Sequence, residues 1–169
     1  GGIGILSSRD QADSQKAMHE RWSFIDSERV GIWGHSGGGS MTLNMLFRHP
    51  ELYKVGVSRA PVPDQRLYDA IYQERYSGLL DQHAEGYEQG SPITHAKNLE
   101  GKLLLIHGTG DDNVHYQGSE RLIDEFVRHN KKFDFLSYPN RAHGIREGEG
   151  TLLHLHSSMS DYFDEHLAQ

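Results

Sequence analysis

The sequence contains no cysteine in its 169 residues, so disulfide bonds and thiolate metal sites are excluded. It also has no run of about 20 apolar residues, which excludes a membrane-spanning helix within it. Positive charge is scarce, because 17 Lys and Arg stand against 24 Asp and Glu and give a formal net charge of −7. Nucleic-acid backbones are bound mainly by cationic side chains, so this balance argues against a nucleic-acid partner.

Internal repeats and low-complexity tracts are also missing, and the length suits one domain of ordinary size. The sequence begins Gly1-Gly2, without a methionine or the charged and apolar segments of a signal peptide. We therefore expect it to be a piece of a longer chain. The absence of cysteine is compatible with either redox compartment and does not locate the protein.

Segments with strand character alternate along the sequence with segments of helical spacing. Strands are predicted over 29–33, 54–58, 102–107 and 132–138. Helices are predicted over 9–22, 38–49, 91–98, 117–129 and 151–166, with a loop or short helix over 67–76. This alternation indicates an α/β protein with a mainly parallel sheet of about four strands flanked by helices.

Two of the predicted helices carry recognisable local signals. Ser91 is expected to cap the helix that starts at Pro92, since serine can cap and proline is pre-set for a first turn. The helix over 117–129 is expected to bury one apolar stripe, formed by Leu122, Ile123, Phe126 and Val127.

The most distinctive motif is Gly34-His35-Ser36-Gly37-Gly38, between a predicted strand and a predicted helix. It matches G-x-S-x-G, the strained turn that presents a nucleophilic serine in α/β-hydrolases. We expect a positive φ at Ser36, and a collision with strand and helix for any side chain at Gly34 or Gly38. The N–H of Gly37, at a helix N-terminus, is expected to form half of an oxyanion hole. A glycine-rich turn without chemistry is the alternative, whereas a Walker phosphate loop is excluded because Gly-Lys-Ser/Thr is absent.

A nucleophilic serine needs an acid and a base, which follow it in that order in α/β-hydrolases. Of the twelve histidines, His143 follows the last predicted strand and is the candidate base, while His35 is expected to point away from the reacting centre. Asp111 and Asp112 both follow the strand over 102–107, and the residues themselves leave open which one is the acid. The other aspartate is expected to hold the loop by accepting backbone N–H bonds.

From about Asp10 onward the sequence resembles the catalytic domain of the prolyl oligopeptidase family, most closely its dipeptidyl peptidase IV branch. The resemblance lies in residues 28–38, 60–62, 68–76, 107–115 and 143–145. It implies a serine-type peptidase that cleaves after proline in short peptides through an acyl-enzyme, without a metal or organic cofactor. It also implies that Asp111 is the acid that serves His143 and Ser36.

The resemblance further implies which residues bind the peptide substrate. Asn113 would touch the substrate carbonyl, and an apolar S1 pocket would be lined by Val62, Tyr68, Tyr72 and Val114. Tyr68 and Tyr72 are four residues apart and would share one face of a helix. The sequence departs from better known members, which carry bulky aromatics or a tryptophan where it has His35, Gly37 and Gln65. We therefore expect a wider S1 pocket.

Compared with this family, residues 1–169 correspond to the C-terminal portion of the catalytic domain. The β-propeller, the upstream hydrolase strands and a tyrosine that completes the oxyanion hole are expected to be missing, and activity is expected to be low. The strand over 29–33 would then be an open edge that pairs with a second copy of the chain or is covered by residues 1–6. Family members of this branch are usually periplasmic, secreted or surface-attached.

Two other readings of the sequence stay open. An esterase or an acyl-aminoacyl peptidase could use the same fold and the same three residues, and a catalytically silent fragment is the alternative from another class. A metal site is less favoured, because no His-Glu-x-x-His pattern is present and His154 and His156 would not share a helix face.

Overall fold

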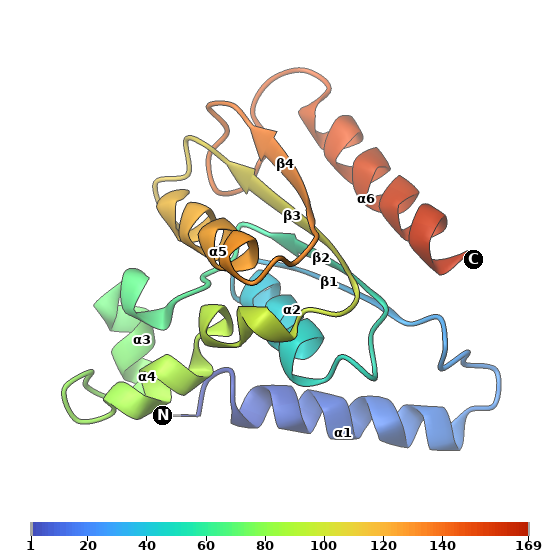
Figure 1. Cartoon of the computed structure of the whole chain (residues 1–169). Coiled ribbons are helices and arrows are strands. Elements are labelled where there is room, and N and C mark those ends of the chain that lie inside the picture. The colour runs from blue at the N-terminus through green and yellow to red at the C-terminus, as the bar shows by residue number, and fades with distance from the viewer. Residues whose placement is uncertain (1, 169) are drawn as a thin grey trace.

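The protein is built around a four-stranded parallel sheet with helices on both faces, as a computed structural model of residues 2–168 shows (Figure 1). The strands are neighbours in chain order: β1 (Gly31–His35), β2 (Val55–Arg59), β3 (Lys102–Gly108) and β4 (Asp134–Tyr138). Every neighbouring pair is parallel. The predicted α/β class and four-stranded parallel sheet are therefore confirmed.

Helical segments connect the strands and cover the sheet. They are α1 (Leu6–Arg21), α2 (Gly37–Arg48), α3 (Ala70–Ser77), α4 (Ala84–Gly90), α5 (Gln117–Arg128) and α6 (Thr151–Leu167), with 3₁₀ segments η1 (Gln65–Leu67) and η2 (Pro92–Asn98). Helices α2 and α5 and segment η2 lie on one face of the sheet, and α6 lies on the other (Figure 1). Helix α1 packs below α2.

The core is divided by the sheet into two apolar layers, and β3 supplies both. Leu103 and Leu105 belong to the layer under α2 and α5, whereas Leu104 and Ile106 belong to the layer under α6. This follows from the alternation of side chains along a strand. It explains why the sequence of β3 is an uninterrupted apolar run, as expected for a parallel strand that is covered on both faces.

Two local predictions about helices are wrong. Ser91 makes no side-chain cap for η2, because its hydroxyl accepts from the backbone N–H of Gln65 and donates to the carbonyl of Tyr87. Val127 is 67% exposed, so the apolar stripe of α5 is centred on Leu122 and Phe126 instead. In both cases tertiary contacts override the local pattern.

Most elements lie within a few residues of their predicted ranges, and strand β1 and helix α4 show where the prediction fails. Strand β1 ends at His35 rather than residue 33, because its ladder with β2 continues to the pair His35 and Arg59. Helix α4 was not predicted, because its sequence AEGYEQG has no apolar stripe and buries only Tyr87 and Gly90.

Strand β1 is an edge of the sheet in the part of the chain that the structure describes, since it pairs with β2 alone. Residues 2–6 do not cover this edge. Gly4 instead lies so close to Gly90, at the end of α4, that a Cβ atom at Gly4 would clash with the Gly90 carbonyl. Covering of the edge by residues 2–6 is therefore wrong, and residue 1 lies outside the described range. Pairing with a second copy stays a prediction, and Trp33 on this strand is 58% exposed.

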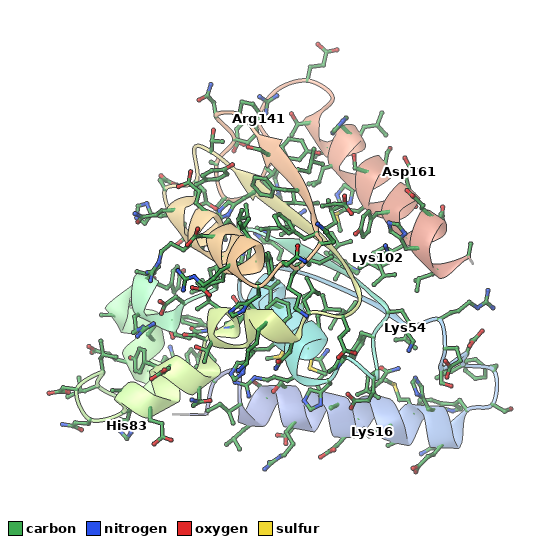
Figure 2. The ribbon with its side chains drawn as sticks, in the orientation of Figure 1. Lys16, Lys54, His83, Lys102, Arg141 and Asp161 are labelled. Carbon is green, nitrogen blue, oxygen red and sulfur yellow. The ribbon has the colours of Figure 1, made fainter. Side chains whose placement is uncertain are left out.

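The charged side chains of Lys16 on α1 and Asp161 on α6 lie at the periphery (Figure 2), whereas Arg59, Asp64 and Asp111 are buried. Across residues 2–168, no helix is both long enough and apolar enough to cross a membrane.

Candidate active site

Ser36 occupies a sharp turn between β1 and α2. Its φ of 58° and ψ of −121° lie outside the regions that non-glycine residues normally adopt. The backbone N–H of Ser36 donates to the carbonyl of Arg59 at the end of β2, which holds the turn against the sheet. The predicted positive φ is confirmed, and α2 begins immediately after the serine at Gly37.

The glycines beside Ser36 do not all have the predicted purpose. A Cβ atom at Gly34 would clash with the backbone carbonyl of Gly38, so the need for glycine at Gly34 is confirmed. A Cβ atom at Gly38 would meet nothing within 4 Å, so the predicted collision there is wrong. The tight contact falls one residue later, because a Cβ atom at Gly39 would lie 2.7 Å from the Arg59 carbonyl. Gly34 and Gly39 therefore permit the close approach of α2 to the sheet.

Asp111 and His143 meet beyond the ends of β3 and β4. The Nδ1 atom of His143 lies 2.8 Å from Oδ2 of Asp111, whose side chain is fully buried. An ionised carboxylate only accepts hydrogen bonds, so Nδ1 of His143 carries the proton. The other ring nitrogen, Nε2, is then left with a lone pair that can accept a proton.

The backbone of the loop is also held by Asp111 and not by Asp112. Oδ1 of Asp111 accepts from the N–H of Asn113 at 3.0 Å and of Val114 at 2.9 Å. The expectation that the two aspartates divide these tasks is wrong, since Asp111 performs both and Asp112 is exposed. Burial alone would raise the pKa of Asp111, but hydrogen bonds from His143, Val114 and Asn113 outweigh it and lower the pKa. The carboxylate is therefore ionised at neutral pH.

A second histidine, His107, contacts the same carboxylate. It is completely buried at the end of β3, and its Nε2 lies 3.0 Å from Oδ2 of Asp111. Burial lowers the pKa of His107 despite the neighbouring negative charge. We did not predict this residue from the sequence. The available signal was a titratable side chain at an inward-facing position of a strand that is otherwise apolar on both faces.

His35 lies against His143 and does not point away from it as expected. Their ring centroids are 4.5 Å apart, and Nδ1 of His35 accepts a hydrogen bond from Nε of Arg59 at 3.0 Å. Burial, the positive charge of Arg59 and the neighbouring His143 lower the pKa of His35 to about 4. His35 is consequently neutral at neutral pH and forms part of the wall around His143.

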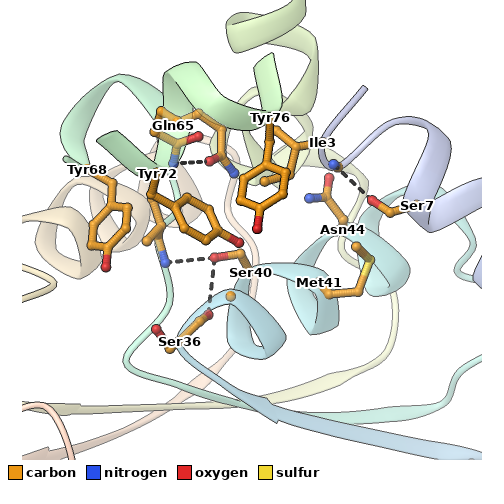
Figure 3. Close-up of a pocket in the computed structure, with 14 residues that line it drawn as sticks. Ile3, Ser7, Ser36, Ser40, Met41, Asn44, Gln65, Tyr68, Tyr72 and Tyr76 are labelled. Atoms are coloured by element: carbon orange, nitrogen blue, oxygen red, sulfur yellow. Dashed lines mark hydrogen bonds between the residues drawn. The ribbon is translucent and has the colours of Figure 1, made fainter. Parts of the chain in front are cut away.

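A cavity of about 410 Å³ opens beside Ser36 (Figure 3). Three of the residues predicted to form the S1 pocket, Val62, Tyr68 and Tyr72, line it together with Gly37. The rings of Tyr68 and Tyr72 meet edge to face with centroids 5.5 Å apart. The predicted shared helix face is wrong, because Tyr68 precedes α3 and only Tyr72 belongs to it.

The wall of this cavity also contains a polar pair (Figure 3). Nε2 of Gln73 donates to Oε1 of Gln65 at 2.5 Å, and both side chains are buried. Oε1 of Gln73 is buried without a hydrogen-bond partner in the part of the chain that the structure describes. The cavity is therefore aromatic near Tyr68 and Tyr72 and amide-lined near Gln65.

The remaining two predicted binding residues lie next to this cavity rather than in its lining. Oδ1 of Asn113 accepts from the hydroxyl of Tyr68 at 3.0 Å, which leaves the amide N–H groups of Asn113 as donors. Val114 is buried and lines a smaller neighbouring cavity together with Val62. Tyr68 therefore connects the cavity beside Ser36 to Asn113, and Val62 connects it to Val114. Among residues 2–168, no group of three or more His, Asp and Glu side chains is arranged to hold a metal ion.

The parallel sheet, the strained serine after a strand and the aspartate and histidine on later loops define the chain as an α/β-hydrolase. Solved structures support this class. The crystal structure of Porphyromonas gingivalis dipeptidyl peptidase 4 superposes with a TM-score of 0.92 at 35% identity and covers 98% of this chain. That of a putative dipeptidyl aminopeptidase IV from Bacteroides ovatus gives 0.91 at 33% identity, also over 98% of the chain.

Within this class, the chain belongs to the prolyl oligopeptidase family, whose model matches residues 4–169. A probable dipeptidyl peptidase 4 of Aspergillus flavus is 43% identical over 125 residues, which is 72% of this chain and 16% of that protein. Human dipeptidyl peptidase 8 is 37% identical over 159 residues, 90% of this chain and 18% of that protein. The chain spans less than a quarter of each of these relatives and of the two solved structures, which it covers to 23%.

Proposed function

We propose that this chain carries the catalytic serine, aspartate and histidine of a serine peptidase that acts on short peptides. The observation that carries the proposal is the 2.8 Å hydrogen bond from His143 to the buried Asp111, on the sheet edge that also bears the strained Ser36. This bond orients the imidazole and leaves its Nε2 as the base. Membership of the prolyl oligopeptidase family supports the same reaction.

In the proposed mechanism, Oγ of Ser36 attacks the scissile carbonyl carbon while Nε2 of His143 takes the hydroxyl proton. Asp111 stabilises the imidazolium that forms, and the N–H of Gly37 donates to the developing oxyanion. His143 then gives the proton to the leaving amine, which leaves an acyl-enzyme on Ser36. Attack by water, with His143 again as base, releases the acid product and restores the serine.

Cleavage after proline is the specificity that we infer. Val62, Tyr68 and Tyr72 give the cavity beside Ser36 an apolar, aromatic wall suited to a pyrrolidine ring. The donor groups of Asn113, whose carbonyl oxygen is occupied by Tyr68, are suited to a substrate carbonyl. The relatives are named dipeptidyl peptidases and the family is named for prolyl oligopeptidase, and these names together support this substrate class.

A second candidate is an acyl-aminoacyl peptidase or esterase with a broader acyl pocket. The specific observation in its favour is the amide pair of Gln65 and Gln73, which makes one wall of the cavity polar. Rates on a proline amide, an alanine amide and a simple acyl ester separate the two candidates. Preference for the proline amide supports the first, and equal amide rates with a faster ester support the second.

The nucleophile is tested by intact mass after treatment with a fluorophosphonate, which requires no knowledge of the substrate. We expect one adduct on the wild-type chain, none on Ser36→Ala, and one on Ser7→Ala, the control for the exposed serine at the same cavity. An adduct that persists in Ser36→Ala would contradict the assignment. If the chain forms no adduct, the same probe on a chain extended upstream decides between a missing oxyanion donor and a wrong nucleophile.

A further inference from the structure

His107 is the titratable group that the proposed mechanism leaves without a task. It is fully buried, and all of its ring nitrogen contacts are polar. Nδ1 lies 2.7 Å from Oγ of Ser119 on α5, and Nε2 lies 3.0 Å from Oδ2 of Asp111 and 2.9 Å from the carbonyl oxygen of Val114. A side chain held by three partners, two on the loop after β3 and one on α5, is a rigid element of the site.

These contacts fix the proton on the ring. Nε2 faces a carboxylate oxygen and a carbonyl oxygen, both of which only accept hydrogen bonds, so Nε2 must carry a hydrogen. The neutral ring then has its lone pair on Nδ1, where the hydroxyl of Ser119 can donate. The opposite tautomer would place a lone pair against two acceptor oxygens. The carbonyl of Val114 and the carboxylate of Asp111 therefore select the Nε2–H tautomer, and the hydroxyl of Ser119 is compatible with it.

The carboxylate of Asp111 is consequently tied at both oxygens independently of His143. Oδ1 accepts from two backbone N–H groups, and Oδ2 accepts from His107 as well as from His143. When His143 moves or exchanges its proton, a carboxylate held at Oδ2 only by His143 would keep its two bonds at Oδ1 but lose its anchor at Oδ2. The hydrogen bond from His107 keeps Oδ2 anchored and supplies a donor that favours the ionised form.

We propose that His107 is a positioning residue, whose tautomer is set by the acceptor oxygens of Asp111 and Val114 and which holds Asp111 in the orientation that serves His143. The inference rests on the proposed function, but its geometric part can be tested without activity. It requires that the N–H donor at the place of Nε2, rather than the bulk or charge of the imidazole, is what the site needs.

The test replaces His107 by glutamine or by asparagine, whose side-chain amides reach the positions of Nε2 and Nδ1, respectively. In His107→Gln the terminal amide reaches the place of Nε2 and still donates toward Asp111, whereas in His107→Asn it stops at the place of Nδ1. We expect fluorophosphonate labelling of Ser36 to slow about tenfold or more in His107→Asn and to stay within about threefold of wild type in His107→Gln. Because loss of the donor raises the pKa of Asp111, the acid limb of the labelling profile should move to higher pH in His107→Asn alone.

Equal labelling rates and equal pH profiles in the two variants would overturn the proposal. Nuclear magnetic resonance of imidazole-¹⁵N-labelled protein gives the second measurement and needs no turnover. We expect His107 in the Nε2–H tautomer in the wild-type chain and also in Ser119→Ala, because Asp111 and Val114 still accept from Nε2 in that variant. A pure Nδ1–H tautomer in the wild-type chain would also overturn it.

The two proposals fail in different ways. If the wild-type chain is not labelled but His107→Asn weakens the His143 to Asp111 hydrogen bond in the resonance spectrum, the positioning role stands and the assignment of activity to this chain fails. If labelling is normal in both folded variants, with melting temperatures matched to wild type, the positioning role fails and the nucleophile assignment stands.

Discussion

The imidazole of His35 packs on the imidazole of His143, with a 4.5 Å separation of centroids and a 40° tilt. His35 directly precedes Ser36, so the residue next to the proposed nucleophile also packs against the proposed base. Arg59 on β2 fixes the ring of His35 by donating a hydrogen bond to its Nδ1. A charge on His35 would therefore repel both Arg59 and His143, and the acidity of His35 links pH to the integrity of the site.

We predict that His35 makes folding sensitive to mild acid. The pKa of a free histidine is 6.5, and that of His35 in the folded protein is about 4. Below pH 6.5 the unfolded chain therefore binds a proton at His35 that the folded chain does not bind until the pH approaches 4. Stability from this group is complete above pH 6.5 and is lost as the pH falls toward 4.

The variant His35→Asn keeps an acceptor for Arg59 and cannot titrate. Between pH 7 and pH 5, urea unfolding should show wild type losing about 1 kcal/mol more than His35→Asn, after allowance for solvent screening at this partly exposed ring. Parallel pH profiles of the two proteins would contradict the prediction.

Neutralising Asp111 should abolish most of the reactivity of Ser36, whereas neutralising Asp112 should leave it unchanged. In Asp111→Asn the amide can donate to His143 and favours the wrong tautomer, so we expect fluorophosphonate labelling to slow by about 10³ to 10⁴. Asp112→Asn, one residue away and exposed, is the matched control and should label at the wild-type rate. Similar losses in both variants would show that loop integrity, rather than the bond to His143, is what the change disrupts.

Alanine should be tolerated at Gly38 and not at Gly34. A Cβ atom at Gly34 meets backbone that cannot move aside, and we expect a loss of about 2–4 kcal/mol in the free energy of unfolding. At Gly38 the space is open and the residue is helical, so alanine should stabilise by about 0.5–1 kcal/mol. Thermal unfolding of the two variants checks this, and comparable destabilisation by both would refute the assignment of open space at Gly38.

The amide pair in the cavity wall should show strong coupling. Gln65→Leu removes the acceptor of a buried amide and should cost about 1–3 kcal/mol, as should Gln73→Leu. In the double variant no amide is left unpaired, so its cost should be smaller than the sum of the two. A double-mutant cycle from urea unfolding measures this, and strict additivity would mean that the pair does not interact in solution.

The features that the sequence predicts best are those that depend on local chemistry. A short apolar run such as 102–107 is typical of a strand that is covered on both faces of a sheet. The motif around Ser36 requires a strained turn. Strand character and helical spacing elsewhere were enough to predict the number of strands and their parallel arrangement. These patterns are set by backbone geometry and can be read without knowing the tertiary structure.

The features that could not be predicted depend on partners distant in sequence. Ser91 is a typical capping residue, but its hydroxyl accepts a hydrogen bond from the backbone N–H of Gln65 instead. Nothing in the sequence around His35 predicts that its ring packs on His143. Asp111 and Asp112 are chemically identical neighbours, and only the direction of the loop distinguishes them. The contacts of His107 cannot be predicted, because its partner Ser119 lies in the next helix and the sequence of the strand does not show which groups face it.

The order of the strands in the sheet is also their order in the chain. Each strand can therefore dock on the exposed side of the one before it, and no strand has to insert between two that are already paired. The loop after β1 brings Ser36, the loop after β3 brings Asp111, and the loop after β4 brings His143 last. During synthesis or refolding, Ser36 would lie at the edge of a three-stranded sheet before β4 had added. Its proposed base would arrive only with the loop after β4, so we expect reactivity to appear only after β4 has paired with β3.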